Sequence, residues 1–276
     1  MKKNLIKKDG SLNRWCSMSE KEPDYEMLNL EGIYALLESD FSKAEELFKK
    51  ACELEENCYE SLCNLGKLYA VQENFEKAIK YFQKSLEKNP TFIETLHNLG
   101  VSYFRIGKIE EAIEFYKKAL AVDKDYFQSS FNLGNCYYQL DQKDIAVKWY
   151  KKSILSNQSF LDARFNLANT YRELNQFELA IKTFEEILQI WKDDATVFYN
   201  LGYTYHVQEK LDKAIENYLR AIEFRKDYLK AIINLGIAYQ KKNDKENALK
   251  YLEKAFEINP EIDFVVEKIN EIKKGS

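Results

Sequence analysis

The chain has 276 residues, of which 45% are hydrophobic and 31% charged, with a formal net charge of -4. This charge excludes a general electrostatic attraction to nucleic acid, and the 9 glycines and 3 prolines are too few for the many turns of an all-β fold. The sequence has no apolar run of about 18 residues, so it predicts no membrane span.

Residues 1–24 carry six basic and four acidic side chains and fit no repeat, so we interpret them as a flexible basic tail. Only Leu5 and Ile6 separate its lysines, so the apolar stretch of a signal peptide is missing. A further hypothesis is that the tail competes with ligands for acidic residues of the repeats. The basic residues of this hypothesis are Lys2, Lys3, Lys7, Lys8 and Arg14, and the acidic residues are Glu26, Glu60 and Glu94. Asp24 is predicted to cap the first helix.

The cysteines are odd in number, form no CxxC pair and match no spacing of metal ligands. They are Cys16, Cys52, Cys58, Cys63 and Cys136. This usage argues against disulfides and zinc and favours free thiols or small buried side chains. It indicates a reducing compartment, and we expect a cytoplasmic location.

From residue 25 onward the sequence repeats seven times with a period of 34 residues. A small residue recurs as Gly32, Gly66, Gly100, Gly134, Ala168, Gly202 and Gly236. Three positions later stand Ala35, Tyr69, Tyr103, Tyr137, Tyr171, Tyr205 and Tyr239. Sixteen positions after the small residue stand Phe48, Phe82, Tyr116, Tyr150, Phe184, Tyr218 and Leu252. Seven copies without insertion or deletion indicate one repeated supersecondary unit.

Each repeat shows two runs of helical apolar spacing with a break between them, which predicts two antiparallel helices. The break carries residues such as Gly107, Asp141 and Asn175, most of which tolerate the left-handed conformation that ends a helix. The small residue marks the closest crossing of the two helices, where we expect the backbones to approach each other. The aromatic residues would fill the space around this crossing.

This pattern resembles that of the tetratricopeptide repeat (TPR) family. The resemblance implies an all-α fold, a right-handed superhelical solenoid of seven helix-turn-helix repeats followed by a capping helix. The repeats are predicted at 25–58, 59–92, 93–126, 127–160, 161–194, 195–228 and 229–262, with the capping helix and C-terminal end at 263–276. Val265, Ile269 and Ile272 would form the apolar stripe of that last helix.

The resemblance also implies that the first helix of every repeat lines a concave groove, through repeat positions 2, 5, 6, 9, 12 and 13. Position 6 is Leu30 in the first repeat and asparagine in the others, namely Asn64, Asn98, Asn132, Asn166, Asn200 and Asn234. An asparagine amide can pair with both the N–H and the C=O of one ligand peptide unit. Six would hold on the order of 15 residues of an extended peptide. The row looks like the asparagine ladder of the superhelical repeat domain in O-linked N-acetylglucosamine transferases. The alternative is that each is a polar residue tolerated on a helix face.

The other groove positions vary and would give specificity. Glu60 and Glu94 at position 2 would favour basic ligand side chains. Phe131, Phe165 and Tyr199 at position 5 would hold apolar or aromatic ligand groups, with packing between helices as the alternative. Cations at positions 12 and 13 would meet acidic ligand groups or remain solvated. These are Arg105, Arg172, His206 and Lys241.

No sequence motif for catalysis, a cofactor or a metal is present, and the two histidines, His97 and His206, lie three repeats apart. We predict a non-catalytic adaptor, without cofactor, that binds a protein or an extended peptide. Nucleic acid and membrane are not expected partners, and the chain would be a monomer or self-associate weakly. Two alternatives stay open. One is a regulatory or targeting subunit of an enzyme complex. The other is a scaffold that assembles through its ends or through a convex face that includes Phe115 and Trp149.

Overall fold

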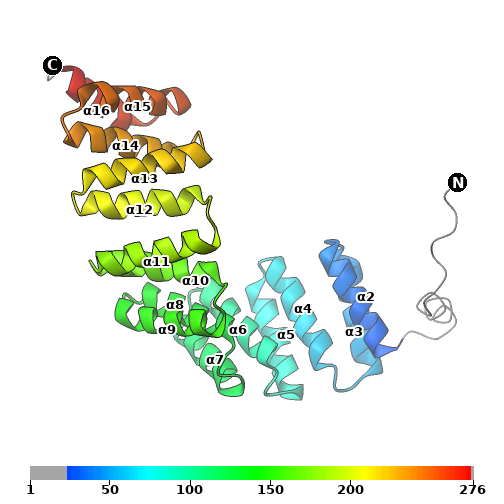
Figure 1. Cartoon of the computed structure of the whole chain (residues 1–276). Helices are drawn as coiled ribbons and strands as arrows, with labels where there is room; N and C mark the ends of the chain where they lie inside the picture. The colour runs from blue at the N-terminus through cyan, green and yellow to red at the C-terminus, as the bar shows by residue number, and fades with distance from the viewer. Residues whose placement is uncertain (1–23, 275–276) are drawn as a thin grey trace, which may run out of the picture. The chain divides into compact units, whose positions relative to one another are not determined.

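The computed structural model describes residues 24–274, which form helices joined by short connections. Their fifteen helices comprise seven helix-turn-helix pairs and a final single helix, as predicted (Figure 1). The first helices are α2 (Tyr25–Leu37), α4 (Tyr59–Val71), α6 (Ile93–Arg105), α8 (Phe127–Gln139), α10 (Leu161–Glu173), α12 (Ala195–Val207) and α14 (Leu229–Lys241). The second helices are α3 (Phe41–Leu54), α5 (Phe75–Lys88), α7 (Ile109–Val122), α9 (Lys143–Ser156), α11 (Phe177–Ile190), α13 (Leu211–Phe224) and α15 (Lys245–Ile258). The single helix is α16 (Asp263–Lys274).

A residue with positive φ follows the first helix of every pair. The seven residues are Ser39, Glu73, Gly107, Asp141, Asn175, Glu209 and Asn243, with φ between 57° and 80°. The predicted left-handed turn at Gly107, Asp141 and Asn175 is therefore confirmed. Ser39 and the two glutamates adopt the same conformation, although it is uncommon for their residue types. The tight connection between the antiparallel helices imposes it.

Several helices begin at a residue whose side chain caps the helix N-terminus. The Asp24 carboxylate accepts a hydrogen bond from the backbone N–H of Met27 at 2.9 Å, which confirms the predicted cap of α2. Asp40, Asn74 and Asp244 cap α3, α5 and α15 in the same way. Each of these caps satisfies a backbone donor that has no partner inside its own helix.

The small residue of each first helix lies against the side chain 16 residues later in the second helix. A Cβ added at Gly134 would lie 2.4 Å from Cε1 of Tyr150, and one added at Gly66 would lie 2.4 Å from Cε1 of Phe82. The predicted close crossing is confirmed, and an aromatic ring fills the space at Gly32, Gly66, Gly100, Gly134 and Gly202, whereas Leu252 fills it at Gly236. The ring enters the space because the first helix has no side chain there.

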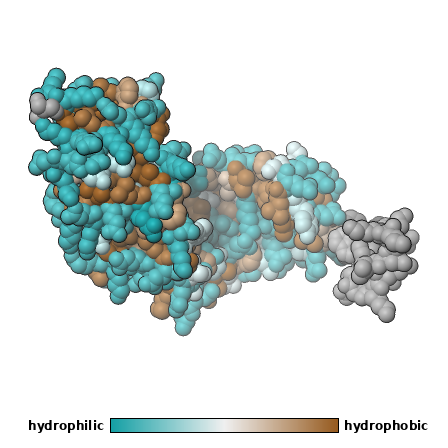
Figure 2. Space-filling model, turned by 45° about the horizontal axis from the view of Figure 1, so that its top comes forward, coloured by the Kyte–Doolittle hydropathy of each residue, from teal (hydrophilic) through white to brown (hydrophobic). Residues whose placement is uncertain are grey.

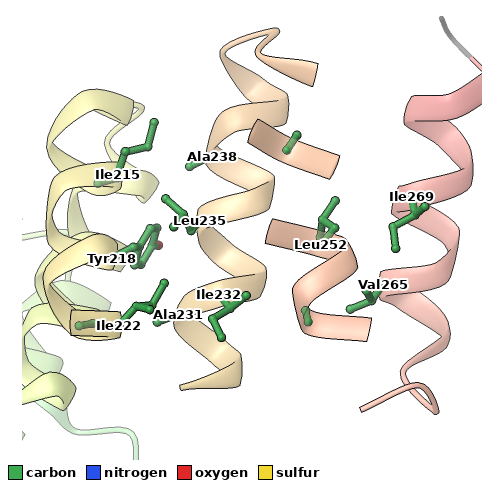
Figure 3. Packing of buried hydrophobic residues seen from close by; sticks show 14 of the residues in the cluster. Ile215, Tyr218, Ile222, Ala231, Ile232, Leu235, Ala238, Leu252, Val265 and Ile269 are labelled. Carbon is green, nitrogen blue, oxygen red and sulfur yellow. The ribbon is translucent and has the colours of Figure 1, made fainter. Parts of the chain in front are cut away.

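The helix contacts divide the chain into two compact units, unit 1 (Met1–Asp123) and unit 2 (Lys124–Ser276). In unit 1, one cluster of buried side chains runs from α2 to α6. In unit 2, the largest cluster runs from α13 to α16. Figure 3 shows Tyr218, Leu235 and Leu252 directed into this cluster from α13, α14 and α15. Aromatic and aliphatic side chains therefore hold consecutive pairs together in both units.

The last helix buries the stripe that the sequence predicted. Val265, Ile269 and Ile272 are 0%, 9% and 5% exposed, and they belong to the cluster shared with α13 to α15. On the face shown in Figure 2, hydrophilic residues predominate and apolar residues reach the surface in separate strips. Within residues 24–274, every helix is too short or too polar to cross a lipid bilayer.

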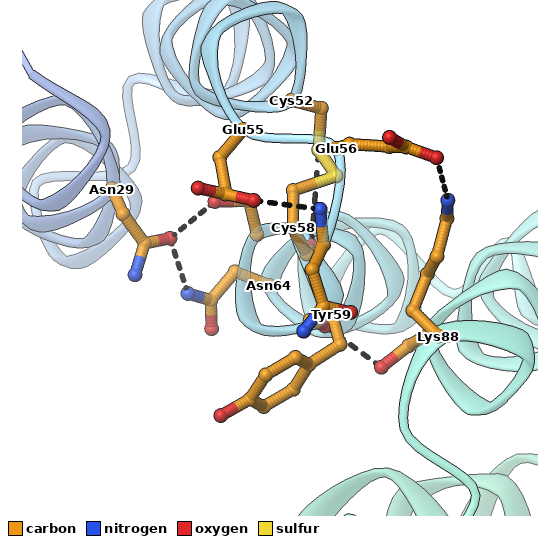
Figure 4. The surroundings of a disulfide bond; sticks show 11 residues. Asn29, Cys52, Glu55, Glu56, Cys58, Tyr59, Asn64 and Lys88 are labelled. Carbon is orange, nitrogen blue, oxygen red and sulfur yellow. Dashed lines mark hydrogen bonds and ion pairs between the residues drawn. A yellow bond between two sulfur atoms is a disulfide. The ribbon is translucent and has the colours of Figure 1, made fainter.

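Two cysteines meet at the connection between the first two pairs. Cys52 lies near the end of α3 and Cys58 just before α4, with their Cα atoms 5.1 Å apart, within the range for a disulfide. The structure joins them by a disulfide (Figure 4). The expectation of unpaired cysteines was therefore wrong here, because the chain turns back between the repeats. The cysteine count no longer favours a reducing compartment. Cys63 and Cys136 are free and buried, as predicted.

Candidate functional site

The first helices of neighbouring pairs lie side by side within each unit. In unit 1, α2 contacts α4 and α4 contacts α6, and in unit 2, α12 contacts α14. We call their side chains at repeat positions 2, 5, 6, 9, 12 and 13 the first-helix surface of each unit. All the residues proposed for ligand contact belong to this surface.

In unit 1, Asn64 is only 6% exposed, and both the nitrogen and the oxygen of its amide are hydrogen-bonded; Figure 4 shows the bond to Asn29. Its Nδ2 donates to Oδ1 of Asn29 on α2 at 3.0 Å, and its Oδ1 accepts from Nζ of Lys67 at 3.2 Å. Ser61 Oγ donates to the same Asn29 oxygen at 2.9 Å. Asn98 on α6 is half-buried. Asn64 thus links the first helices of the first two repeats.

In unit 2, Asn132 and Asn166 meet the same neighbour. Asn135 Nδ2 lies 3.4 Å from Oδ1 of Asn132, and Asn166 Nδ2 donates to Oδ1 of Asn135 at 3.0 Å. Tyr150 also donates its hydroxyl to Asn135 Oδ1, at 2.8 Å. The two position-6 residues are half-buried. Asn135 therefore joins α8, α9 and α10.

The last two asparagines also bond across first helices. Asn200 is 8% exposed, and its Oδ1 accepts from Nη1 of Arg172 on α10 at 2.9 Å. Its Nδ2 donates to the backbone oxygen of Thr196 at 2.8 Å. The half-buried Asn234 donates to the hydroxyl of Tyr199 on α12 at 3.2 Å. The asparagines at position 6 thus use part of their hydrogen-bonding capacity inside the protein.

The sequence reasoning missed Asn29 and Asn135 as partners of the row. Both lie on the first helix of the preceding repeat, at positions 5 and 9. The sequence signal that could have identified them is an asparagine at position 5 or 9 of one repeat that is followed by an asparagine at position 6 of the next repeat. Contact with a ligand stays a prediction for all six residues of the row.

The acidic residues of unit 1 are not equivalent. Glu94 forms an ion pair of 2.5 Å with Lys67 on the preceding first helix, so its charge is balanced. Glu60 is half-buried and Glu26 is exposed. The basic residues that would compete for these acids lie in 1–23, outside the described residues. Lys67, at position 9 of the second repeat, was not among the predicted site residues.

The three position-5 aromatics are half-buried and lean onto the second helices. The ring centroids are 5.9 Å apart for Phe131 and Tyr150, 5.8 Å for Phe165 and Phe184, and 6.0 Å for Tyr199 and Tyr218. These distances are those of packed aromatic pairs. The rings thus contribute to the core and also keep an accessible part on the first-helix surface.

Two of the four cations are paired with carboxylates of the preceding repeat. Arg105 lies 3.4 Å from Oε1 of Glu73, and Lys241 lies 2.7 Å from Oε1 of Glu209. Both pairs are exposed to solvent, where such pairs contribute little to stability. Arg172 has the different surroundings described below.

Both histidines are neutral at pH 7. Burial lowers the pKa of His97 to about 4, although Glu94 acts in the opposite direction. Burial and the charge of Lys241 lower the pKa of His206, whose Nδ1 lies 3.4 Å from the hydroxyl of Tyr218. His97 belongs to unit 1 and His206 to unit 2. Among residues 24–274, no three His, Cys, Asp or Glu side chains are placed to hold a metal ion.

The second helices carry the two aromatics named for a scaffold contact. Phe115 stacks on Tyr103 with centroids 5.4 Å apart. Trp149 is half-buried, with Nζ of Lys152 lying 5.1 Å from its ring. Phe115 thus packs within its own repeat, and contact of either residue with a partner stays a prediction.

Comparisons with known proteins agree with this architecture. Among solved structures, the chain is similar to YrrB, described as a TPR protein with an unusual peptide-binding site, at 23% identity and a TM-score of 0.58 over 67% of this chain and 96% of that one. It is similar to the C-terminal part of a TPR repeat-containing protein from Cytophaga hutchinsonii, at 16% identity and a TM-score of 0.75 over 87% and 98% of the two chains. It is also similar to a chain of the hetero-tetramer of Cut9 and Hcn1 from the APC/C, at 17% identity and a TM-score of 0.61 over 94% of this chain and 51% of that one. These likenesses show the fold alone.

A search among curated proteins finds no significant match. A family model described as tetratricopeptide repeat matches residues 58–125, 91–154 and 193–261, and a second with that description matches 21–91. A model described as TPR repeat matches residues 168–209, and no catalytic family is identified. Because the first of these models alone covers more than half of the chain, the chain belongs to the tetratricopeptide repeat family.

Proposed function

We propose that this chain is a non-catalytic module that binds an extended peptide or partner segment on the first-helix surface. Proteins of the TPR family typically mediate protein–protein contacts. The observation that carries the proposal is that asparagine amides lie next to polar side chains of the adjacent first helix. In unit 2, Asn166 bonds to Asn135 and Asn234 bonds to Tyr199. An extended peptide has unpaired backbone groups that such amides can bind.

The half-buried asparagines are the candidates for direct contact. Asn98, Asn132, Asn166 and Asn234 are more accessible than Asn64 and Asn200, which are 6% and 8% exposed. We propose that the accessible four pair with the ligand backbone, in the manner of the asparagine ladder that the row resembles. Asn64 and Asn200 would orient neighbouring side chains, since they are almost buried and both the oxygen and the nitrogen of each amide bond within the protein.

Glu60 and the position-5 aromatics would add specificity. Glu60 is half-buried and would favour a basic ligand side chain, whereas Lys67 balances the charge of Glu94. The accessible edges of Phe131, Phe165 and Tyr199 would contact apolar ligand groups.

An array of random peptides of about 15 residues tests the proposal, because that length matches the expected span. The variant Asn98→Ala/Asn132→Ala/Asn234→Ala changes half-buried amides of the first-helix surface. The matched control Gln83→Ala/Gln189→Ala/Asn217→Ala removes three amides from the second helices α5, α11 and α13. Circular dichroism checks that all three proteins fold.

We expect the wild type to bind a subset of the peptides, and the first-helix variant to bind them at least about tenfold more weakly. The control should bind like the wild type. Equal binding by all three proteins would place the site elsewhere, and an array without bound peptides would reject the proposal.

A second candidate function is a scaffold that assembles through the α2 end. Leu30, Tyr34 and Leu37 form one stripe of α2 and are 51%, 57% and 76% exposed. The equivalents of Leu30 and Tyr34 in the next repeat, Asn64 and Leu68, are 6% and 0% exposed, whereas the equivalent of Leu37, Val71, is 62% exposed. Among the described residues no pair precedes α2, so Leu30 and Tyr34 resemble an uncovered stacking face.

Sedimentation velocity separates the two candidates. A scaffold of this kind predicts concentration-dependent association that Leu30→Lys/Tyr34→Lys abolishes. A wild type that stays monomeric at high concentration would exclude it. For a regulatory or targeting subunit, we expect co-purification with an enzyme whose activity changes when this chain is removed.

A further inference from the structure

Arg172 on α10 differs from the other cations of the first-helix surface. Arg105 and Lys241 each pair with a carboxylate of the preceding repeat. Among the described residues, Arg172 has no carboxylate in ion-pair contact, and its Nη1 donates to the neutral amide oxygen of Asn200 at 2.9 Å. A guanidinium has five N–H donors, so most of its donors remain available.

An aromatic side chain of the next first helix lies against this guanidinium. Its Cζ lies 5.0 Å from the ring centroid of Tyr203 on α12. Tyr203 is 40% exposed and Tyr138 on α8 is 36% exposed, so both rings also face solvent. Burial lowers the pKa of Arg172, and Tyr203, Glu173, Tyr199 and Tyr138 act in the opposite direction. The cation is therefore partly desolvated, at a place to which α8, α10 and α12 all contribute.

The neighbouring carboxylate is held by other groups. Glu173 accepts a hydrogen bond of 2.5 Å from the hydroxyl of Tyr138 and lies 3.4 Å from Nζ of Lys143 on α9. Lys143 in turn lies 2.7 Å from Asp141. These contacts balance Glu173 and Lys143 against other groups, while the guanidinium of Arg172 contacts the amide of Asn200 and the accessible ring of Tyr203.

We propose that Arg172 binds an acidic group of the peptide ligand, a carboxylate or a phosphate, between Tyr138 and Tyr203. A carboxylate or a phosphate accepts two parallel N–H bonds from a guanidinium. Asn200 holds one terminal nitrogen and so orients the planar group. The tyrosine rings would contact the apolar part of the ligand next to its acidic group. This inference rests on the proposed peptide binding and specifies the ligand class for unit 2.

The test uses the full chain and an array of matched peptides. Each peptide is present in versions that carry glutamate, glutamine or phosphoserine at one central position, and in versions with a free or an amidated C-terminus. Arg172→Gln removes the charge and keeps a polar side chain. Arg105→Gln removes a cation that is already paired with Glu73. Arg172→Lys keeps the charge without the bidentate geometry and serves if Arg172→Gln does not fold.

We expect the wild type to prefer the acidic versions over glutamine by roughly tenfold or more. Arg172→Gln should lose this preference, Arg172→Lys should reduce it, and Arg105→Gln should keep it. If the phosphoserine versions bind most tightly, the acidic group of the ligand is a phosphate. If the glutamate versions do, it is a side-chain carboxylate, and if the versions with a free C-terminus do, it is a terminal carboxylate.

Two results would overturn the inference while leaving peptide binding intact. One is a wild type that binds peptides without any preference for the acidic versions. The other is an undiminished preference in both Arg172 variants. An array on which the wild type binds no peptide would overturn the inference and the proposed function together.

Discussion

The amide of Asn64 donates to the amide oxygen of Asn29, 3.0 Å away on the first helix of the preceding repeat. Asn64 is 6% exposed and also accepts from Lys67. Replacing it with alanine removes both bonds and leaves part of a buried network unsatisfied. We therefore expect Asn64→Ala to lower the free energy of unfolding by about 1–2 kcal/mol.

Urea unfolding followed by circular dichroism measures this loss. Asn234→Ala is the matched control, since its amide makes a single bond of 3.2 Å and is half-buried. We expect a smaller effect for the control. Equal effects of the two substitutions would contradict the structural role given to Asn64.

The crossing at Gly134 has no room for a methyl group. A Cβ there would lie 2.4 Å from Cε1 of Tyr150, a side chain that is 1% exposed and cannot move into solvent. Gly134→Ala should therefore cost about 1–3 kcal/mol of stability through overpacking. Thermal and urea unfolding measure the cost.

The fifth repeat provides the opposite control. Ala168 occupies the equivalent position next to Phe184, and both are 0% exposed. Ala168→Gly should also destabilise, by about 1 kcal/mol, because it removes a packed methyl group and adds backbone freedom. A stabilising effect of Gly134→Ala would show that the Tyr150 ring can move aside.

His97 makes stability depend on pH. The unfolded chain takes up its proton near the ordinary pKa of 6.5, whereas burial lowers the pKa of the folded chain to about 4. Its contribution is complete above pH 6.5 and is lost as the pH falls towards 4. Between about pH 7.5 and about pH 5 the loss should be about 2 kcal/mol.

Urea unfolding at both pH values measures this dependence, and His97→Gln should reduce it. The pKa of His206 is also lowered by burial, so His206→Gln should reduce it as well. Carboxylates with lowered pKa values, such as Glu45, lose their contribution below 4.5 and lie outside this window. An unchanged pH dependence in His97→Gln would show that this imidazole is solvated.

The disulfide closes a short loop between the first two repeats. Cys52 and Cys58 are 6 residues apart, and closing a loop of this size in the unfolded chain stabilises the folded chain by about 2 kcal/mol. We expect dithiothreitol, or the double change Cys52→Ser/Cys58→Ser, to lower the stability by that amount.

Alkylation under denaturing conditions provides an independent measurement. Without reductant, the reagent should label Cys63 and Cys136, which are free, and should label Cys52 and Cys58 only after reduction. The serine variant should no longer respond to dithiothreitol. Labelling of Cys52 and Cys58 before reduction would show that the pair is not formed in the isolated protein.

The period of the sequence determined the helices and their turns. Each repeat carries its own helical apolar spacing, its small residue and its turn residue, and these act within a few tens of residues. The left-handed turn at Asn175, the cap at Asp24 and the buried stripe of α16 therefore follow from local patterns. The close crossing of the two helices follows in the same way, from the small residue and the large side chain 16 positions later.

Only the tertiary structure decided which side chains pair between repeats. Asn64 bonds to Asn29, Glu94 pairs with Lys67, and Arg172 donates to an amide. The disulfide belongs to the same class, because the return of the chain after α3 brings two separate cysteines together. Each polar group has several candidate partners on the neighbouring helix, and distance and rotamer select among them. A one-dimensional pattern contains neither, so it could name the residues of the first-helix surface but not their bonds.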